Sequence, residues 1–209
     1  MGPTFLNRSD AGEKLVKRLA KYKNRKDAIV LAIPRGGVVV GYEIAKALKV
    51  KLDIIVTKKI GYPENSELAI GAVSLGGKAI LDEAIVSEHD ISRGYINAEV
   101  KEMQREVERR YKQYRGGKKL PELKSKIVII VDDGIATGYT TLAAIQFVKS
   151  EKPKKIILAV PVIPRETFES LQKEADEIVC LNVADVFFSI SRFYEEFPQL
   201  EDEEVKKYL

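Results

Sequence analysis

Five short runs of apolar residues, rich in isoleucine and valine, constrain the fold of this chain more than any other feature. They are AIVLAI (28–33), LDIIVT (52–57), KIVIIV (126–131), KIILAV (155–160) and EIVCL (177–181). Continuous apolar runs of this length are typical of strands that are covered on both faces, as in a parallel sheet. Apolar residues at helical spacing precede the second and the fourth run. This alternation predicts an α/β fold with a mainly parallel sheet, flanked by helices and joined by right-handed crossovers.

The interval from residue 58 to 125 breaks the alternation. Its first part predicts a hairpin around Gly76-Gly77, and its second part predicts an amphipathic helix that ends at Gly116-Gly117. We expect one domain over residues 1–209, with 58–125 as an inserted flexible hairpin and helix and 182–209 as a C-terminal hood. A closing lid and a static packing or dimer element are both consistent with the insertion. Near the N-terminus, Asp10 and Glu13 have the spacing of a capping box.

Composition excludes several classes of protein. The 35 basic and 31 acidic residues are interspersed, which argues against a dedicated nucleic-acid arm. A single cysteine excludes an intrachain disulfide, and no spacing of Cys and His resembles a zinc site. We find neither the apolar region of a signal peptide nor a run long enough to cross a bilayer, so we expect a cytoplasmic protein without membrane contact.

Polar, cationic or glycine-rich residues follow four of the five runs. In open α/β sheets, ligands bind beyond the carboxyl ends of the strands, so these residues should meet at one edge. They are Arg35, Gly36 and Gly37 after the first run, Lys58 and Lys59 after the second, Asp132 and Asp133 after the third, and Arg165 after the fourth.

The third strand end carries the most informative stretch, VDDGIATGYT. A Gly/Thr loop that leads into a helix presents free N–H groups and the positive end of the helix dipole, which suits a phosphate monoester. An ordinary tight connection with a threonine N-cap is the alternative. Asp132 and Asp133 would repel phosphate, but carboxylates accept hydrogen bonds from sugar hydroxyls and hold Mg²⁺. A ligand with a diol or a metal beside a phosphate therefore fits better than an acidic pair on a solvated edge.

Two further elements suit a second, more highly charged phosphate group. The segment Arg35-Gly36-Gly37 permits close approach of an anion to the backbone, and Lys58 and Lys59 add two positive charges one strand away. Either element alone would be an ordinary turn or a solvated lysine pair.

These residues together match a family. VIIVDDGIATGYT resembles the 5-phosphoribosyl-1-diphosphate (PRPP) motif of the type I phosphoribosyltransferases, with PRGG in the place of the diphosphate loop. Nearly the whole chain is similar to stand-alone predicted phosphoribosyltransferases whose acceptor is unassigned, through IPRGGVVVGYEIA, KKIGYPENSELAIGAV and RFYEEFPQLEDEEV.

The resemblance implies a role for each matching residue. Asp132 and Asp133 would be the catalytic acids that bind the ribose hydroxyls. Mg²⁺ would be the cofactor, held near these acids through PRPP and water, with no direct protein ligand. The diphosphate loop often contains a non-proline cis peptide in this family. The 5-phosphate would lie on Ala136, Thr137, Gly138, Tyr139 and Thr140, and the diphosphate on Arg35, Gly36, Gly37, Lys58 and Lys59.

The implied activity is that of a PRPP-dependent glycosyltransferase of nucleotide metabolism, a pentosyltransferase that moves the phosphoribosyl group to a nitrogenous base and releases diphosphate. We expect a homodimer and no nucleic-acid partner. A non-catalytic regulator that senses PRPP or a nucleotide is the alternative, and an unrelated phosphate-binding α/β domain is a third.

The acceptor itself is not identified by the sequence. A cluster of aromatic residues near the C-terminus could stack on a base, although a small core that holds the hood is the commoner role of such clusters. Arg165 could face the acceptor or begin a helix, and His89 suits a surface position better than a general base. The aromatic residues are Phe187, Phe188, Phe193, Tyr194 and Phe197.

Overall fold

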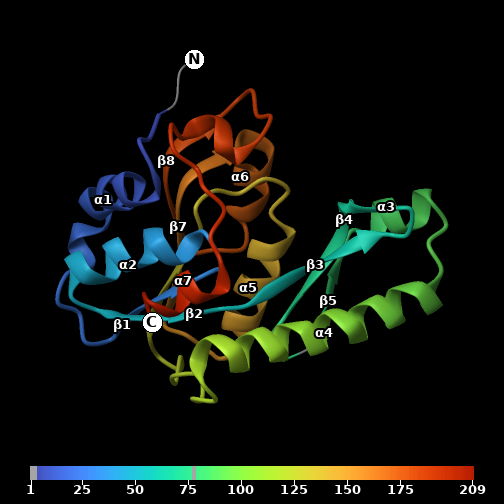
Figure 1. The fold of residues 1–209 in the computed structure, drawn as a ribbon, viewed down its shortest axis with the longest axis horizontal. Helices are drawn as coiled ribbons and strands as arrows, with labels where there is room; N and C mark the ends of the chain where they lie inside the picture. The colour runs from blue at the N-terminus through green and yellow to red at the C-terminus, as the bar shows by residue number, and fades with distance from the viewer. Residues whose placement is uncertain (1–3, 77–78) are drawn as a thin grey trace.

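The centre of the molecule is a parallel sheet of five strands in the order β2-β1-β6-β7-β8 (Figure 1). The structure is a computed structural model that describes residues 4–76 and 79–209. Each apolar run of the sequence contributes one strand, which confirms the predicted fold class. The strands are β1 (Ala28–Ala32), β2 (Lys51–Ile54), β6 (Ile127–Val131), β7 (Lys155–Pro164) and β8 (Glu177–Ala184).

Helices cover both faces of this sheet because successive strand residues point to opposite sides. α1 (Arg8–Leu19) and α2 (Gly37–Leu48) pack on the face that includes Val30. α5 (Tyr139–Ser150) and α6 (Arg165–Leu171) pack on the face that includes Leu31. Both side chains are fully buried, so the central strands are apolar on both faces, as the continuous runs predicted.

The interval after β2 forms a second, antiparallel sheet that extends to one side of the central sheet (Figure 1). The predicted hairpin is present as β4 and β5, although Gly77 of its turn lies outside the described residues. The predicted amphipathic helix is α4, which ends at Gly116 in a left-handed conformation (φ 59°). The elements are β3 (Thr57–Tyr62), β4 (Asn65–Ser74), β5 (Ala79–Leu81), α3 (Glu83–Glu88) and α4 (Arg93–Arg115).

α4 is joined to the main core. Val107, Tyr111 and Tyr114 are buried in one cluster with Ile54 and Val56, which lie at and just beyond the end of β2. The C-terminal half of the helix therefore packs on the main domain, while Ile96 near its start packs under the second sheet.

Two local expectations were wrong. Lys58 and Lys59 were expected directly at the carboxyl end of the second strand, but β2 ends at Ile54 and both lysines belong to the next strand, β3. The first helix does not use the spacing of Asp10 and Glu13. It begins at Arg8, and the side chain of Asn7 accepts a hydrogen bond from the backbone N–H of Asp10.

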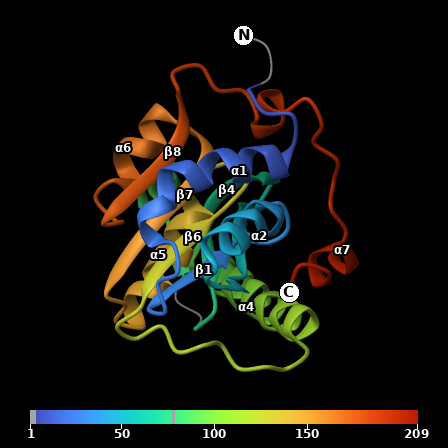
Figure 2. The same cartoon turned by 90° about the vertical axis from the view of Figure 1, so that its left-hand side faces the viewer.

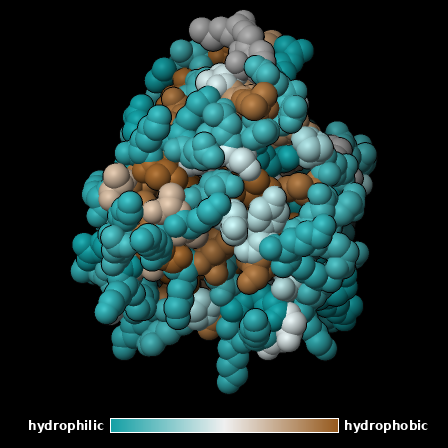
Figure 3. Space-filling model, turned by 60° about the vertical axis from the view of Figure 1, so that its left-hand side comes forward, coloured by the Kyte–Doolittle hydropathy of each residue, from teal (hydrophilic) through white to brown (hydrophobic). Residues whose placement is uncertain are grey.

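The C-terminal segment returns from β8 across the molecule to α4. Figure 2 shows this segment, in red, running along one side of the domain to α7 (Asp202–Lys206). A 3-10 helix (Ile190–Phe193) begins it, and Phe5 and Tyr194 join the two ends of the chain through a β-bridge. On the face in Figure 3, apolar surface gathers near the middle among hydrophilic side chains. Within the described parts of the chain, no helix combines the length and apolar character that a membrane span requires.

Candidate functional site

Two aspartates follow β6, the middle strand of the central sheet. Asp132 is half-buried, and its Oδ1 accepts a hydrogen bond from the backbone N–H of Asp133 at 2.8 Å. Burial, together with the neighbouring Asp133 carboxylate, raises the pKa of Asp132. Asp133 is 8% exposed, so neither acid points into open solvent.

The Asp133 carboxylate has a cationic partner that sequence reasoning missed. Nε of Arg8, on α1, donates to Oδ2 of Asp133 at 2.7 Å. The hydroxyl of Tyr194 donates to the backbone oxygen of Asp133 at 2.6 Å. Helix α1 and the C-terminal segment therefore both hold the acid motif. No local sequence signal marks Arg8, which is one of several basic residues on an amphipathic helix.

The loop after the acids leads into α5, as predicted. Gly138 is the N-cap residue with φ 84°, a conformation that favours glycine. A Cβ atom at this position would lie 2.7 Å from Cγ2 of Thr167, whose hydroxyl donates to the backbone oxygen of Ala136 at 2.8 Å. Ala136 and Thr137 are exposed. The loop thus presents the first N–H groups of α5 to the outside, where an anion is favoured.

Tyr139, the first residue of α5, connects this loop to the second sheet. Its hydroxyl donates to the carboxylate of Asp82, which is the N-cap residue of α3. Burial and this hydrogen bond raise the pKa of Tyr139 to about 12.

The PRGG loop lies directly against the acids. The Pro34–Arg35 peptide bond is cis. A Cβ atom on Gly36 would lie 1.7 Å from Oδ2 of Asp133, and one on Gly37 would lie 2.8 Å from Cα of Asp132. Only glycine fits at these two positions, so the loop and the acid motif form one surface.

The predicted cations have carboxylate neighbours in this structure. Nη1 of Arg35 lies 3.8 Å from Oε2 of Glu201 and 4.0 Å from Oδ1 of Asp202. Nζ of Lys58 lies 3.9 Å from Oε1 of Glu106 on α4. Burial and the nearby Arg110 lower the pKa of Lys58. Lys59 is half-buried in the same strand.

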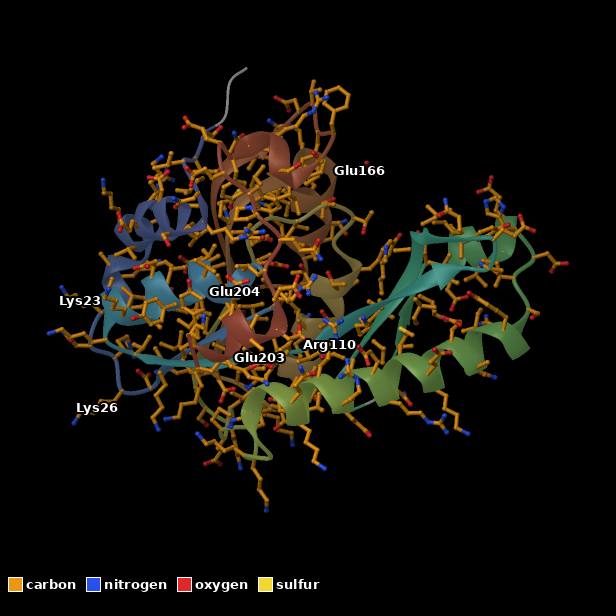
Figure 4. All side chains as sticks on the ribbon, viewed as in Figure 1. Lys23, Lys26, Arg110, Glu166, Glu203 and Glu204 are labelled. Carbon is orange, nitrogen blue, oxygen red and sulfur yellow. The ribbon has the colours of Figure 1, made fainter. Side chains whose placement is uncertain are left out.

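Glu106 and Asp202 are in turn held by α4. Nε of Arg110 donates to Glu106 at 2.7 Å, and the Tyr114 hydroxyl donates to Asp202 at 2.5 Å. Figure 4 labels Arg110 on α4 and Glu203 and Glu204 on α7, two helices in contact with each other. Cations and carboxylates from four elements thus surround the PRGG side of the site.

The aromatic residues near the C-terminus separate into two groups. Tyr194 and Phe197 pack with Phe5 in a small core. Phe188 is 72% exposed, and it lines a cavity of about 720 Å³ together with Phe187, Arg165, Asp185 and Ala136 of the anion-suited loop.

Two other candidates from the sequence, Arg165 and His89, lie at helix ends. Arg165 begins α6 and forms an ion pair with Asp185. His89 is an exposed residue at the end of α3, where it contacts the ring of Tyr62.

The donor set bears on the expected magnesium ion. Residues 4–76 and 79–209 contain no group of three or more His, Cys, Asp or Glu side chains that could hold a metal. Mg²⁺ is commonly held by one or two carboxylates together with water and the phosphates of a ligand. Asp132, half-buried beside the PRGG loop, fits a magnesium ion that is held mainly through water and the phosphates of a ligand.

Comparison with known proteins decides the family. A family model described as "Phosphoribosyl transferase domain" matches residues 5–197. The chain is a member of the phosphoribosyl transferase family. Rv0571c of Mycobacterium tuberculosis, whose name places it among the phosphoribosyl transferases, is 38% identical over 205 residues, which are 98% of this chain and 46% of that protein. The chain therefore spans about half the length of the curated relatives it matches.

Solved structures agree with this phosphoribosyl transferase fold. TT1426 from Thermus thermophilus is 34% identical with a TM-score of 0.81, and the match covers 100% of this chain and 97% of that one. Purine phosphoribosyltransferase from Pyrococcus horikoshii is similar in fold, with a TM-score of 0.50 and 22% identity over 96% of this chain and 99% of that one.

Proposed function

We propose that this phosphoribosyl transferase moves the 5-phosphoribosyl group of PRPP to a nitrogenous base and releases diphosphate. The contact between the PRGG loop and the acid pair is the observation that carries the proposal. Gly36 leaves room for the Asp133 carboxylate where any side chain would collide with it. The proposed hydroxyl-binding surface therefore adjoins the two loops proposed to bind anions, and PRPP needs this combination because its ribose lies between two phosphate groups.

Each part of the ligand has a matching part of the site. The 5-phosphate would lie on the loop 136–140, where the N–H groups of α5 and the hydroxyls of Thr137 and Thr140 are donors. The ribose hydroxyls would donate to Asp132 and Asp133. The diphosphate would lie over Gly36 and Gly37, with Arg35, Lys58 and Lys59 as its cations.

In the reaction, the bond between ribose C1 and the diphosphate oxygen breaks, and a bond from C1 to a nitrogen of the acceptor forms. The diphosphate leaves with the bonding electron pair, so negative charge develops on it while positive charge develops on the ring. Arg35 and Lys58 would stabilise the first charge, and the acids would stabilise the second. Mg²⁺, when bound with PRPP, supplies further neutralisation of the diphosphate. Fixing the ring at both ends aligns C1 with the acceptor.

The cavity lined by Phe187, Phe188 and Arg165 is the place we propose for the acceptor. It adjoins Ala136, at the start of the 5-phosphate loop. The exposed ring of Phe188 offers a stacking surface for a planar base.

Turnover of PRPP with a panel of purines, pyrimidines and related heterocycles tests the proposal, with diphosphate release as the measurement. At least one base should support release in the presence of Mg²⁺. Asp132→Asn should lower the rate by about 100-fold, because charge stabilisation at a reacting ring is commonly worth two to three orders of magnitude. Asp90→Asn, an exposed aspartate beyond α3, is the matched control. PRPP binding without turnover of any base would leave a PRPP sensor as the function.

A further inference from the structure

Arg8 contacts three segments that lie far from it in the sequence. Its Nε donates to Asp133, and its Nη1 donates to the backbone oxygen of Pro198 at 2.7 Å. Its Cζ lies 3.7 Å from the centre of the Phe197 ring. A Cβ atom on Gly36 would lie 2.9 Å from Nε. Arg8 therefore joins the first helix, the acid motif, the PRGG loop and the C-terminal segment.

These contacts leave the guanidinium little freedom. The Arg8 and Asp133 side chains are 9% and 11% exposed. The planar fork of arginine can hold a carboxylate and a carbonyl oxygen at fixed angles while its face lies on an aromatic ring, and a lysine cannot reproduce all three contacts. The position of Asp133 is thus set by a group outside the acid motif.

The geometry also determines which part of Asp133 faces a ligand. Oδ2 is engaged by Arg8 and approached by Gly36, so a ligand hydroxyl is left with Oδ1. The positive charge of Arg8 balances the Asp133 carboxylate, which would otherwise repel phosphate groups in both adjoining loops.

We infer that Arg8 is a positioning residue that orients Asp133 toward a ribose hydroxyl and that is itself held by the C-terminal segment. Arg8 touches no part of the ligand in this arrangement. The inference rests on the proposed function, because it requires that Asp133 accepts a hydrogen bond from the sugar.

Discrimination between sugars tests this role more sharply than activity does. Calorimetry would compare ribose 5-phosphate with its 2-deoxy and 3-deoxy analogues, and would measure diphosphate separately. The wild-type protein should bind ribose 5-phosphate at least tenfold more tightly than one of the analogues, because a site that hydrogen-bonds a hydroxyl discriminates against its absence. In Arg8→Lys this preference should fall below about threefold, while diphosphate affinity changes less than twofold.

Two further variants make the result decisive. Arg18→Lys changes an exposed arginine of the same helix and should keep the full preference. Phe197→Leu removes the ring beneath the guanidinium but keeps Arg8, and should lower the preference in the same direction by a smaller factor. It also provides the test if Arg8→Lys does not fold.

The outcomes separate the inference from the proposed function. Unchanged discrimination in both Arg8→Lys and Phe197→Leu, or an equal loss of affinity for every ligand, would show that Arg8 is only a structural residue. A wild-type protein that binds ribose 5-phosphate and both analogues equally would instead remove the hydroxyl-binding role of the acids, and with it the basis for the inference.

Discussion

The two anion-suited sides of the site are built in different ways. The loop before α5 is one continuous segment, and its donors are backbone N–H groups that the helix geometry fixes in place. The PRGG side depends on the side chains of Arg35 and Lys58, and these cations already have Glu201, Asp202 and Glu106 as neighbours. The first side is preorganised, whereas on the second side a ligand must compete with the protein's own carboxylates.

This difference indicates on which side of the site substitutions can change the affinity for a ligand. Backbone donors cannot be removed by substitution of a side chain, so the helix end should tolerate most changes that leave the loop conformation intact. The cation side is set by charge balance among β3, α4, α7 and the PRGG loop, and each of these can change independently.

A pair of glycine substitutions should have the largest effect. Gly36→Ala should lower the affinity for both diphosphate and ribose 5-phosphate by about 100-fold. The new Cβ atom would collide with Asp133, and overpacking of this kind costs about 1–3 kcal/mol. Gly138→Ala should lower only the affinity for ribose 5-phosphate, because this substitution disturbs the N-terminal end of α5 alone. Calorimetric titration of each variant with each ligand is the measurement. Equal losses for both ligands in both variants would contradict the separation of the two sides.

Removal of the two lysines should have the next largest effect. Lys58→Ala with Lys59→Ala should lower diphosphate affinity by about tenfold or more, since hydrogen bonds to charged groups contribute about 1.5–3 kcal/mol. Ribose 5-phosphate affinity should fall by less than about threefold in the same titrations. The control is Lys101→Ala with Lys112→Ala, which removes two exposed lysines of α4. Equal losses of affinity for diphosphate and for ribose 5-phosphate would show that the lysines do not act on the diphosphate side.

Removal of the competing acids should raise affinity. Glu201→Gln with Asp202→Asn frees Arg35, and should strengthen diphosphate binding by about threefold, since exposed charge pairs contribute about 0.2–1 kcal/mol. The Asn amide oxygen can still accept from Tyr114. The control is Glu195→Gln with Glu203→Gln, which removes the same charge from the same segment at positions away from Arg35. This control should leave diphosphate affinity unchanged. Weaker binding in the first variant would indicate that the acids support the site.

The smallest effect concerns stability in acid. Hydrogen bonds from Arg109 and Arg110 lower the pKa of Glu106 to about 2. The unfolded chain binds this proton at higher pH, so the stabilisation is complete above about pH 4.5 and is lost as the pH falls toward 2. Because the group is partly solvated, Glu106→Gln should remove only about 1 kcal/mol at pH 6 and much less at pH 2. Thermal unfolding of this variant and of Glu102→Gln at both pH values measures the difference.

The sequence predicted what lies in contiguous segments. The five strands, α4 and the loop before α5 follow from local periodicity and from glycines at strand ends, and the structure has all of them. Lys58 and Lys59 were misplaced because the apolar run before them (52–57) continues three residues past β2 and into Thr57 of β3, so the boundary between the two strands could not be distinguished in the sequence.

The rest of the site depends on long-range contacts. Arg8 pairs with a residue 125 positions away, and Arg35 contacts acids near the other end of the chain. In sequence, Arg8, Glu201 and Asp202 resemble any solvated charge. The β-bridge between Phe5 and Tyr194 and the route of the C-terminal segment bring Pro198 to Arg8 and Glu201 to Arg35.

The ion pair of Arg8 has a consequence for how the protein is made. Its guanidinium comes from the first turn of the first helix, and the carbonyl oxygen that steadies it belongs to Pro198. A chain emerging from the ribosome can assemble the sheet and the loop before α5 before Pro198 has left the exit tunnel. Until then Arg8 would lack this partner, so the proposed sugar binding should be acquired later than the fold itself, once the segment around Pro198 has emerged.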